Sequence, residues 1–388
     1  MIRRMHPESF VGHKIYFVAS GAGTSFQDQL WMVPGTSSFL VGAAFPYAME
    51  ATGEFLGFKP EKYCSREEAL QLAMEAFMRA ASVPGGKPIG LALTATVSSC
   101  NGPPHRGDHR VFVAIVTAET SYVLKVVLDK NPGCGETARK RDNDSAALAA
   151  EDLLRIVLGE WTFEEAVEAN LRSPGFARRC EIDRVKDDEL LEIFFKHPFF
   201  GQSGARGAQE PAETEVFYPG TFNPLHDGHR TIVRNVGTSD VCYTVNVDGP
   251  HKGTMAPGQM LAIAAQFRRE RLQWHPASVL FTRGEPLFVD KFKARPEKTF
   301  VVGVDTFERM LDPKWGVDPL QVLKSIYDNT ITLFVCDRIV DGVRKSAHGA
   351  IERLVPRGEV PLKHTYIQAI DVEPSALLSS AIRAAAGA

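Results

Sequence analysis

Short apolar runs separated by helix-length segments dominate the second half of the chain. Residues 259–271 have helical spacing, and the apolar runs are rich in β-branched and aromatic residues at 216–218, 241–247, 279–282, 300–302, 331–335 and 366–370. Runs of this length are typical of buried strands. Strands that alternate with helices predict a doubly wound, Rossmann-like parallel sheet, which binds ligands at the carboxyl ends of its strands.

The first half shows a mixed pattern. Apolar runs at 14–19 and 89–95 predict buried strands, and alternating runs at 111–117 and 121–127 predict a hairpin. Ser65 followed by Glu68 is typical of a helix start, and the helix is expected to run to Ala81. An Ala- and Leu-rich stretch at 145–158 predicts another helix. This half is therefore also expected to be α/β.

Between the halves, residues 161–200 are charged and predicted to be helical, with an apolar face formed by Leu190, Leu191, Ile193 and Phe194. Residues 201–214 are small and polar without periodicity, as in a flexible linker. We therefore predict an α/β domain at 1–170, a helical connection and linker at 171–214, and a second α/β domain at 215–388.

Composition narrows the function classes. A chain of 388 residues with 44% hydrophobic content can bury more than one core. The net charge of -3 argues against a nucleic-acid partner, and no apolar stretch is long enough to span a membrane. Six scattered cysteines lack zinc or disulfide spacing and favour a reducing, cytoplasmic location. The first residues do not fit a secretory or transit leader, because Glu8 follows closely on the basic start.

The main chemical candidate is the stretch V-F-Y-P-G-T-F-N-P-L-H-D-G-H at 216–229. Its apolar strand ends in a turn at which Gly220 allows close backbone approach, so that the N–H groups of Thr221 and Phe222 could face an anion. His226 and His229 are one helical turn apart, near a helix amino end that favours negative charge. Both imidazoles could donate to phosphate oxygens, and protonation would strengthen those bonds. The alternative for such a pair is two surface or capping histidines.

This stretch resembles the signature of the nucleotidyltransferase superfamily, whose members transfer a nucleotidyl group from a triphosphate and release pyrophosphate. P-H-K at 250–252 resembles a segment of pyridine-nucleotide adenylyltransferases, which implies that Lys252 lies near phosphates. V-V-G-V-D at 301–305 resembles a strand end of the same enzymes. The resemblance implies that Gly303 and Asp305 contact the nucleotide, with Asp305 accepting bonds from ribose hydroxyls; alternatively, Asp305 caps the following helix.

Two further segments extend this resemblance. Trp315, in D-P-K-W-G, stands where those enzymes place a tryptophan that stacks on the nicotinamide ring; the alternative is an indole packed in the core. L-L-S-S-A-I-R at 377–383 resembles the superfamily's I-S-S-T-x-I-R motif, with Leu378 in place of its first serine. It implies that Ser379 and Ser380 open a phosphate-binding helix and that Arg383 lies over the β- and γ-phosphates; a plain amphipathic helix is the alternative.

The expected function is transfer of AMP from ATP to nicotinamide mononucleotide or its nicotinate counterpart, giving NAD or its deamido form and pyrophosphate. The resemblance implies Mg²⁺ bound with ATP and no metal site built from protein side chains. Self-association, common among related enzymes, is left open. A non-catalytic nucleotide sensor is an alternative. The expected catalytic residues are His226, His229, Lys252 and Arg383, and the expected nucleotide-binding residues are Gly220, Thr221, Phe222, Gly303, Asp305, Trp315, Ser379 and Ser380.

The first half resembles the C-terminal domain of the CinA family, which includes nicotinamide mononucleotide deamidases, in V-P-G-T-S-S-F at 33–39 and Y-A-M-E-A-T-G-E-F-L-G-F at 47–58. Ser20 stands at that family's catalytic serine and Tyr47 at the tyrosine of its Y-S-N-x-x-K motif, but Thr52 replaces the lysine. The family's glycine-rich loop is altered at 94–101. Amide hydrolysis thus lacks a lysine that would help to activate Ser20 and the glycines that would bring backbone close to phosphate. We therefore predict a degenerate domain with a scaffold, regulatory or dimerising role. The alternative is a bifunctional enzyme that deamidates the mononucleotide and then adenylylates the product.

Overall fold

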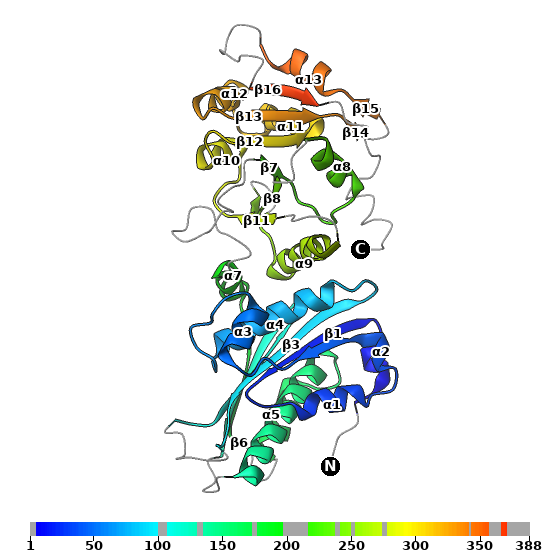
Figure 1. Ribbon diagram of the computed structural model, residues 1–388, viewed down its shortest axis with the longest axis vertical. Coiled ribbons are helices and arrows are strands. Elements are labelled where there is room, and N and C mark those ends of the chain that lie inside the picture. The colour runs from blue at the N-terminus through cyan, green and yellow to red at the C-terminus, as the bar shows by residue number, and fades with distance from the viewer. Residues whose placement is uncertain are drawn as a thin grey trace. The chain divides into compact units, whose positions relative to one another are not determined.

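Two six-stranded sheets organise the chain. The computed structural model describes residues 5–99, 107–129, 135–172, 177–196, 216–236, 241–249, 253–273, 278–340, 343–356 and 366–370 (Figure 1). The chain divides into a first unit, Met1–His197 with Ala256–Ala265, and a second unit, Pro198–Met255 with Gln266–Ala388. Each unit combines one sheet with helices, which confirms the predicted α/β class.

The sheet of the first unit has the order β2-β1-β3-β4-β5-β6. Neighbours β2-β1 and β1-β3 are parallel, and the remaining pairs are antiparallel. The predicted strands and the hairpin are confirmed. The strands are β1 (His13–Ser20), β2 (Leu40–Ala44), β3 (Lys87–Thr96), β4 (Arg110–Val116), β5 (Ser121–Leu128) and β6 (Ala177–Arg184).

Helices cover both faces of this sheet (Figure 1). The predicted start of α4 is confirmed, because the Ser65 hydroxyl accepts the backbone N–H of Glu68 at 3.1 Å. The alanines of α5 let this helix pack closely on the apolar side chains of β1, β3, β4 and β5. The helices are η1 (Pro7–Phe10), α1 (Ser25–Trp31), α2 (Thr36–Phe39), α3 (Met49–Leu56), α4 (Arg66–Ala81), α5 (Glu136–Val157), α6 (Phe163–Arg172) and α7 (Asp187–Lys196).

Strand β6 corrects the prediction of helix throughout 161–200. It pairs with β5, and Cys180 and Ile182 pack against the core while charged residues alternate with them. The inward positions of β6 carry only small or isolated apolar side chains, and charged residues lie between them. The segment therefore has the composition of a charged helix, and its two-residue period was missed. The apolar face of α7 is buried as predicted. Both elements lie in the stretch assigned to the connection but belong to the first unit, and the predicted linker at 201–214 lies outside the described residues.

The second unit has a fully parallel six-stranded sheet of order β11-β8-β7-β12-β13-β16. In chain order this is 3-2-1-4-5-6, the doubly wound Rossmann arrangement, so the predicted sheet is confirmed. All six apolar runs form its strands: β7 (Val216–Pro219), β8 (Val241–Asn246), β11 (Ser278–Thr282), β12 (Thr299–Gly303), β13 (Thr332–Cys336) and β16 (Ile367–Ile370).

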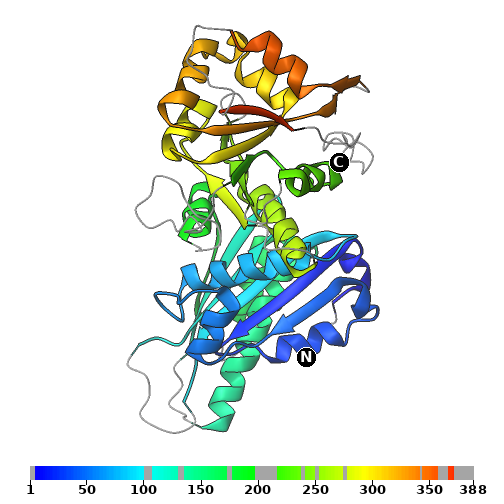
Figure 2. The same cartoon turned by 45° about the horizontal axis from the view of Figure 1, so that its top comes forward.

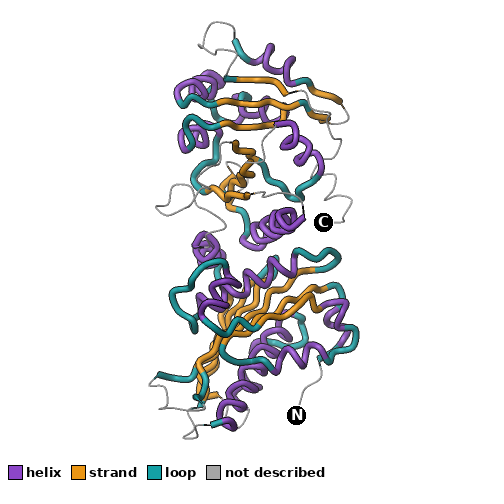
Figure 3. Tube along the Cα trace, viewed as in Figure 1, coloured by secondary structure: helices purple, strands orange, loops and turns teal. Residues whose placement is uncertain are grey.

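The connections of the second unit alternate with these strands (Figure 3). Its main core joins α10 and α12 to β7, β12 and β13 through large side chains such as Phe292, Phe300 and Ile326. The remaining helices are α8 (Asp227–Val236), α10 (Phe288–Ala294), α11 (Val304–Met310), η3 (Pro313–Trp315), α12 (Pro319–Asp328) and α13 (Ala347–Leu354), together with α9 (Pro257–Gln273), whose residues up to Ala265 fall in the first unit. Two two-stranded ribbons pair β9 (Asp248–Gly249) with β10 (Gly253–Thr254) and β14 (Arg338–Val340) with β15 (Val343–Lys345).

The strand order of the second sheet reverses between β7 and β12. In doubly wound sheets generally, the loops after such a pair of neighbouring strands run in opposite directions, and nucleotides bind in the crevice between them. The loop after β7 begins at Gly220, and β12 ends at Gly303. At one edge of this sheet, the red strand β16 lies beside the orange strand β13 (Figure 2). In the described ranges, no helix combines the length and apolar character that crossing a bilayer requires.

Candidate functional site

The turn after β7 is built around a buried phenylalanine. Phe222 is fully buried at φ 46, and its ring packs edge-on against Tyr218, His229 and Tyr243. A Cβ on Gly220 would lie 2.5 Å from this ring, so only glycine fits there. The Gly220 N–H donates to the Thr244 carbonyl at 3.0 Å. The absence of a side chain at Gly220 therefore makes room for the ring of Phe222. Anion binding by the N–H groups of Thr221 and Phe222 stays a prediction.

The two histidines form one buried unit. His226 precedes α8 and His229 lies in its first turn, and their ring centroids are 3.8 Å apart. The Gly228 N–H donates to His226 Nδ1 at 3.2 Å, and the His226 N–H donates to His229 Nδ1 at 3.3 Å. Because each Nδ1 accepts a hydrogen bond, each neutral ring carries its proton on Nε2 and presents a donor there.

Burial and nearby cations keep both rings neutral. Desolvation, reinforced by Arg338 and Arg230, lowers the pKa of His226 to about 4. Desolvation, followed by His226 and Arg338, lowers the pKa of His229 to about 2. The predicted donors are therefore neutral Nε2–H groups, and the extra strength that protonation would give their bonds to phosphate is not available near pH 7. The surface half of the alternative fails, because the two residues are only 5% and 7% exposed. The capping half holds for His226, whose Nδ1 accepts the Gly228 N–H at the start of α8.

At the end of β12, Asp305 is shared by two arginines. Its Oδ1 accepts from Arg338 Nη1 at 3.3 Å, and its Oδ2 accepts from Arg309 Nη2 at 3.1 Å. Gly303 is the N-cap of α11 and Asp305 is the second residue inside the helix, so Asp305 is not its N-cap. A Cβ on Gly303 would lie 2.8 Å from Asp305 Oδ1 and 3.2 Å from Arg338, which explains the glycine.

Sequence reasoning missed two polar groups at this place. Arg338 begins β14 just after β13, so it lies at the carboxyl end of the strand next to β12. The Tyr218 hydroxyl is buried without a hydrogen-bond partner, and burial raises the pKa of Tyr218. A charged residue directly after a buried parallel strand was the available signal for Arg338. Tyr218 gave no signal, because a tyrosine in a strand usually packs as an aromatic ring.

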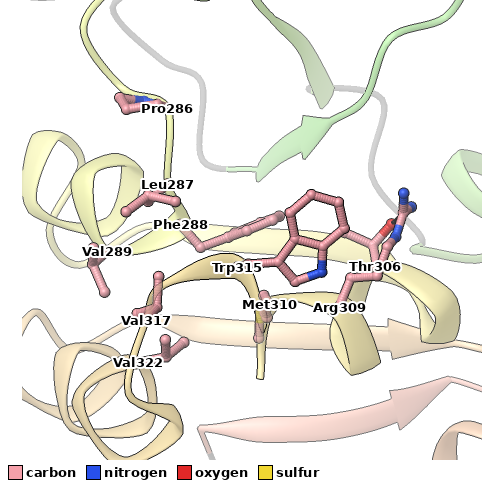
Figure 4. A pocket seen from close by; sticks show the side chains of 10 residues that line it. All are labelled: Pro286, Leu287, Phe288, Val289, Thr306, Arg309, Met310, Trp315, Val317 and Val322. Carbon is pink, nitrogen blue, oxygen red and sulfur yellow. Dashed lines mark hydrogen bonds between the residues drawn. The ribbon is translucent and has the colours of Figure 1, made fainter. Parts of the chain in front are cut away.

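A cavity of about 200 Å³ lies beside α11 (Figure 4). The indole of Trp315 forms part of its wall, with Thr306 and Arg309 beside it, and the other lining side chains are mostly apolar. Arg309, which lines the cavity, also donates a hydrogen bond to Asp305. Trp315 is only partly buried, which fits the predicted ligand-facing position better than a core position. Lys252, Ser379, Ser380 and Arg383 lie outside the described residues, so their roles stay predictions.

In the first unit, the deamidase-like residues are positioned differently from a nucleophile and its base. The buried Ser20 hydroxyl donates to the Pro46 carbonyl at 3.3 Å, and Thr52, in place of the lysine, donates to the same carbonyl at 3.0 Å. Tyr47 is 57% exposed and accepts a hydrogen bond from Arg139 at 2.8 Å. In the described part of this unit, the hydrogen bond of Ser20 thus leads to an acceptor that cannot remove a proton.

A buried network that the sequence did not predict lies at the same end of the sheet. Asp142 Oδ2 accepts from the Ser98 hydroxyl at 2.7 Å and from the Ser98 N–H at 2.8 Å, and it lies 3.2 Å from His109 Nδ1. Arg139 donates to the Ser98 carbonyl at 3.2 Å. Through these bonds Asp142 and Arg139 tie the loop after β3 to α5.

Comparisons with protein-family models and with curated proteins find no match. Solved structures similar to part of the chain carry the family name that the first-half motifs suggest. A CinA superfamily protein from Escherichia coli is 16% identical over 37% of this chain and 81% of its own, with a TM-score of 0.30. A competence or damage-inducible protein from Enterobacter asburiae is 14% identical over 39% and 91%, with a TM-score of 0.31. The protein CihA from Agrobacterium tumefaciens is 20% identical over 38% and 87%, with a TM-score of 0.30. Identities and TM-scores this low carry no argument about activity.

Proposed function

We propose that the second unit transfers AMP from ATP to nicotinamide mononucleotide or nicotinate mononucleotide, forming the dinucleotide and pyrophosphate. The observation that carries the proposal is the meeting of His226, Asp305 and Arg338 where the strand order reverses. Nucleotides bind doubly wound sheets at this place, and the residues there supply hydrogen-bond donors and charge for phosphate.

The reaction needs no protein base. An ionised phosphate oxygen of the mononucleotide attacks the α-phosphorus of ATP, the bond from that phosphorus to the bridging oxygen breaks, and pyrophosphate leaves with the electron pair. The protein aligns the two nucleotides and stabilises the charge that builds on pyrophosphate. Neutral Nε2–H groups suit this task, because they can donate at any pH at which the phosphates are ionised.

Magnesium bound to ATP would neutralise part of the phosphate charge, and phosphate and water oxygens supply most ligands of such an ion. The cavity beside α11 supports a ring-binding role. Trp315 offers a flat aromatic face, and the surrounding lining excludes water from one side of a bound ring. A mononucleotide whose base enters this cavity would place its ribose near Asp305, which accepts a hydrogen bond from the cavity-lining Arg309.

We propose a non-catalytic role for the first unit. The shared Pro46 carbonyl supports it, because both Ser20 and Thr52 are held by an acceptor instead of by each other or by a base. An active deamidase would need a group that removes the serine proton, and neither hydroxyl can do so. Binding of ATP without dinucleotide formation would favour the nucleotide-sensor alternative for the whole chain.

The test is an assay of the full chain with ATP, magnesium and each mononucleotide separately, in which dinucleotide and pyrophosphate are both measured. We expect equal amounts of the two products. His229→Ala should lower turnover by about 10²-fold or more, because it removes an oriented donor to the transition state. His348→Ala is the matched control, since His348 is exposed on α13 of the same unit. Near-normal pyrophosphate release by His229→Ala contradicts the proposal.

A further inference from the structure

Two buried donors at the reversal of strand order lack an acceptor. His226 Nε2 and the Tyr218 hydroxyl have no hydrogen-bond partner in the described part of the chain, although the two residues are only 5% and 3% exposed. Leaving such a group unpaired is energetically costly, so unpaired groups are uncommon in native proteins. Tyr218 precedes the turn that begins at Gly220, and His226 follows it. This placement indicates that a ligand bound at the turn supplies the missing acceptors.

Arg338 adds charge at the same place. Its interaction with Asp305 is the one hydrogen bond described for its guanidinium, and its electrostatic effect reaches Tyr218, His226 and His229. Asp305 also pairs with Arg309, so one carboxylate is shared by two guanidinium groups. The cluster therefore keeps an excess positive charge, and a guanidinium fork with spare N–H groups binds phosphate well.

We propose that Tyr218, His226 and Arg338 form a phosphate cradle, and that Asp305 occupies Arg338 until a nucleotide phosphate displaces it. The inference rests on the proposed function and adds two phosphate-binding residues to it. On binding, Arg338 exchanges one carboxylate oxygen for phosphate oxygens, and Asp305 becomes free to accept hydrogen bonds from a ribose. Gly303 permits this exchange, because a side chain there would meet both Asp305 and Arg338.

Inorganic pyrophosphate is the probe, and its binding to the full chain is measured by isothermal titration calorimetry. Arg338→Gln should weaken binding by at least about tenfold, because it removes a charge-assisted fork. Asp305→Asn should instead tighten binding by about tenfold, because Arg338 no longer has to leave a carboxylate. Arg353→Gln is the control for net charge: Arg353 is exposed and pairs with Glu308, and its removal should leave binding within about twofold.

Combined variants identify the arginine that matters. The gain in Asp305→Asn should disappear when Arg338→Gln is added and persist when Arg309→Gln is added. Arg338→Lys keeps the charge without the fork and should bind with intermediate affinity, which keeps the test valid if Arg338→Gln is poorly folded by circular dichroism. Tyr218→Phe should weaken pyrophosphate binding by about threefold or more without lowering the melting temperature, since its hydroxyl has no partner in the protein.

Unchanged or weaker binding in Asp305→Asn, wild-type affinity in Arg338→Gln, or no pyrophosphate binding by the wild type each overturns the cradle. These outcomes are separable from failure of the proposed function. If Arg338 and Asp305 control pyrophosphate affinity but no dinucleotide forms from ATP and either mononucleotide, the function fails and the cradle stands. If the dinucleotide forms but substitutions of Arg338 and Asp305 leave the pyrophosphate affinity unchanged, only the cradle proposal fails.

Discussion

Acidification should destabilise the second unit through its two neutral histidines. In the unfolded chain their pKa values return to about 6.5, whereas burial lowers them to about 4 for His226 and about 2 for His229 in the folded protein. Between these limits the unfolded state binds more protons than the folded state. Stability therefore rises with pH across this window and falls as the pH drops from 7 toward 4.

The magnitude follows from the same values. At pH 5 an unfolded histidine is almost fully protonated and either folded ring is mostly neutral, which corresponds to about 2 kcal/mol lost per ring relative to pH 7. The pair should therefore cost about 4 kcal/mol, a large share of the stability of one domain. Both rings are at least nine-tenths buried, so solvent screening should reduce this figure only modestly.

The assay compares the wild type with the double variant His226→Asn, His229→Asn by calorimetric unfolding at several pH values. The asparagine Oδ1 can accept the backbone N–H groups that now reach Nδ1, but it does not titrate. The melting temperature of the variant should fall less on acidification than that of the wild type. His348→Asn is the control and should follow the wild type, because His348 is exposed. Parallel curves for the wild type and the double variant would refute neutral buried imidazoles.

Three further outcomes are expected. Trp315→Ala should raise the KM for the mononucleotide by about tenfold and change the KM for ATP much less, whereas Trp31→Ala, at an exposed position of the first unit, should change neither. Incubation with nicotinamide mononucleotide should release no ammonia above the level given by Ser20→Ala; release that this variant abolishes would restore the bifunctional alternative. Burial raises the pKa of Glu68 to about 7, so the first unit should lose about 2 to 3 kcal/mol as the pH rises from 4.5 to 8, and Glu68→Gln should remove this dependence in calorimetry.

Sequence periodicity predicted the second sheet well because the inner strands of a parallel sheet, such as β7, β8 and β12, are buried on both faces. Such strands appear as continuous apolar runs, and all six runs became strands of one sheet. The motif after β7 predicted the histidine pair, since its residues are neighbours in the chain. The motif could not give the ionisation state of the pair, because that state depends on burial and on Arg338, which are properties of the folded chain.

The missed features are contacts between distant residues or strands with unusual composition. Asp305 and Arg338 are separated by 33 positions and meet only because β12 and β13 are neighbours. Asp142 and Ser98 are 44 positions apart and join a helix to a loop. Strand β6 alternates charged residues with Cys180 and Ile182, so its composition concealed its period. No local pattern encodes such pairings, whereas the topology of each sheet does.

The site at the carboxyl ends of β7 and β12 combines two kinds of donor whose physical roles differ. Neutral imidazoles contribute directed hydrogen bonds but little attraction at a distance, while Arg338 contributes charge that acts before contact. A protonated pair of histidines beside Arg338 would repel it and each other, and burial would make that repulsion costly. Keeping the rings neutral lets them lie 3.8 Å apart and near a guanidinium, so close packing favours the neutral state. In this arrangement Asp305 holds the guanidinium of Arg338 in place, and the two imidazole rings stay uncharged.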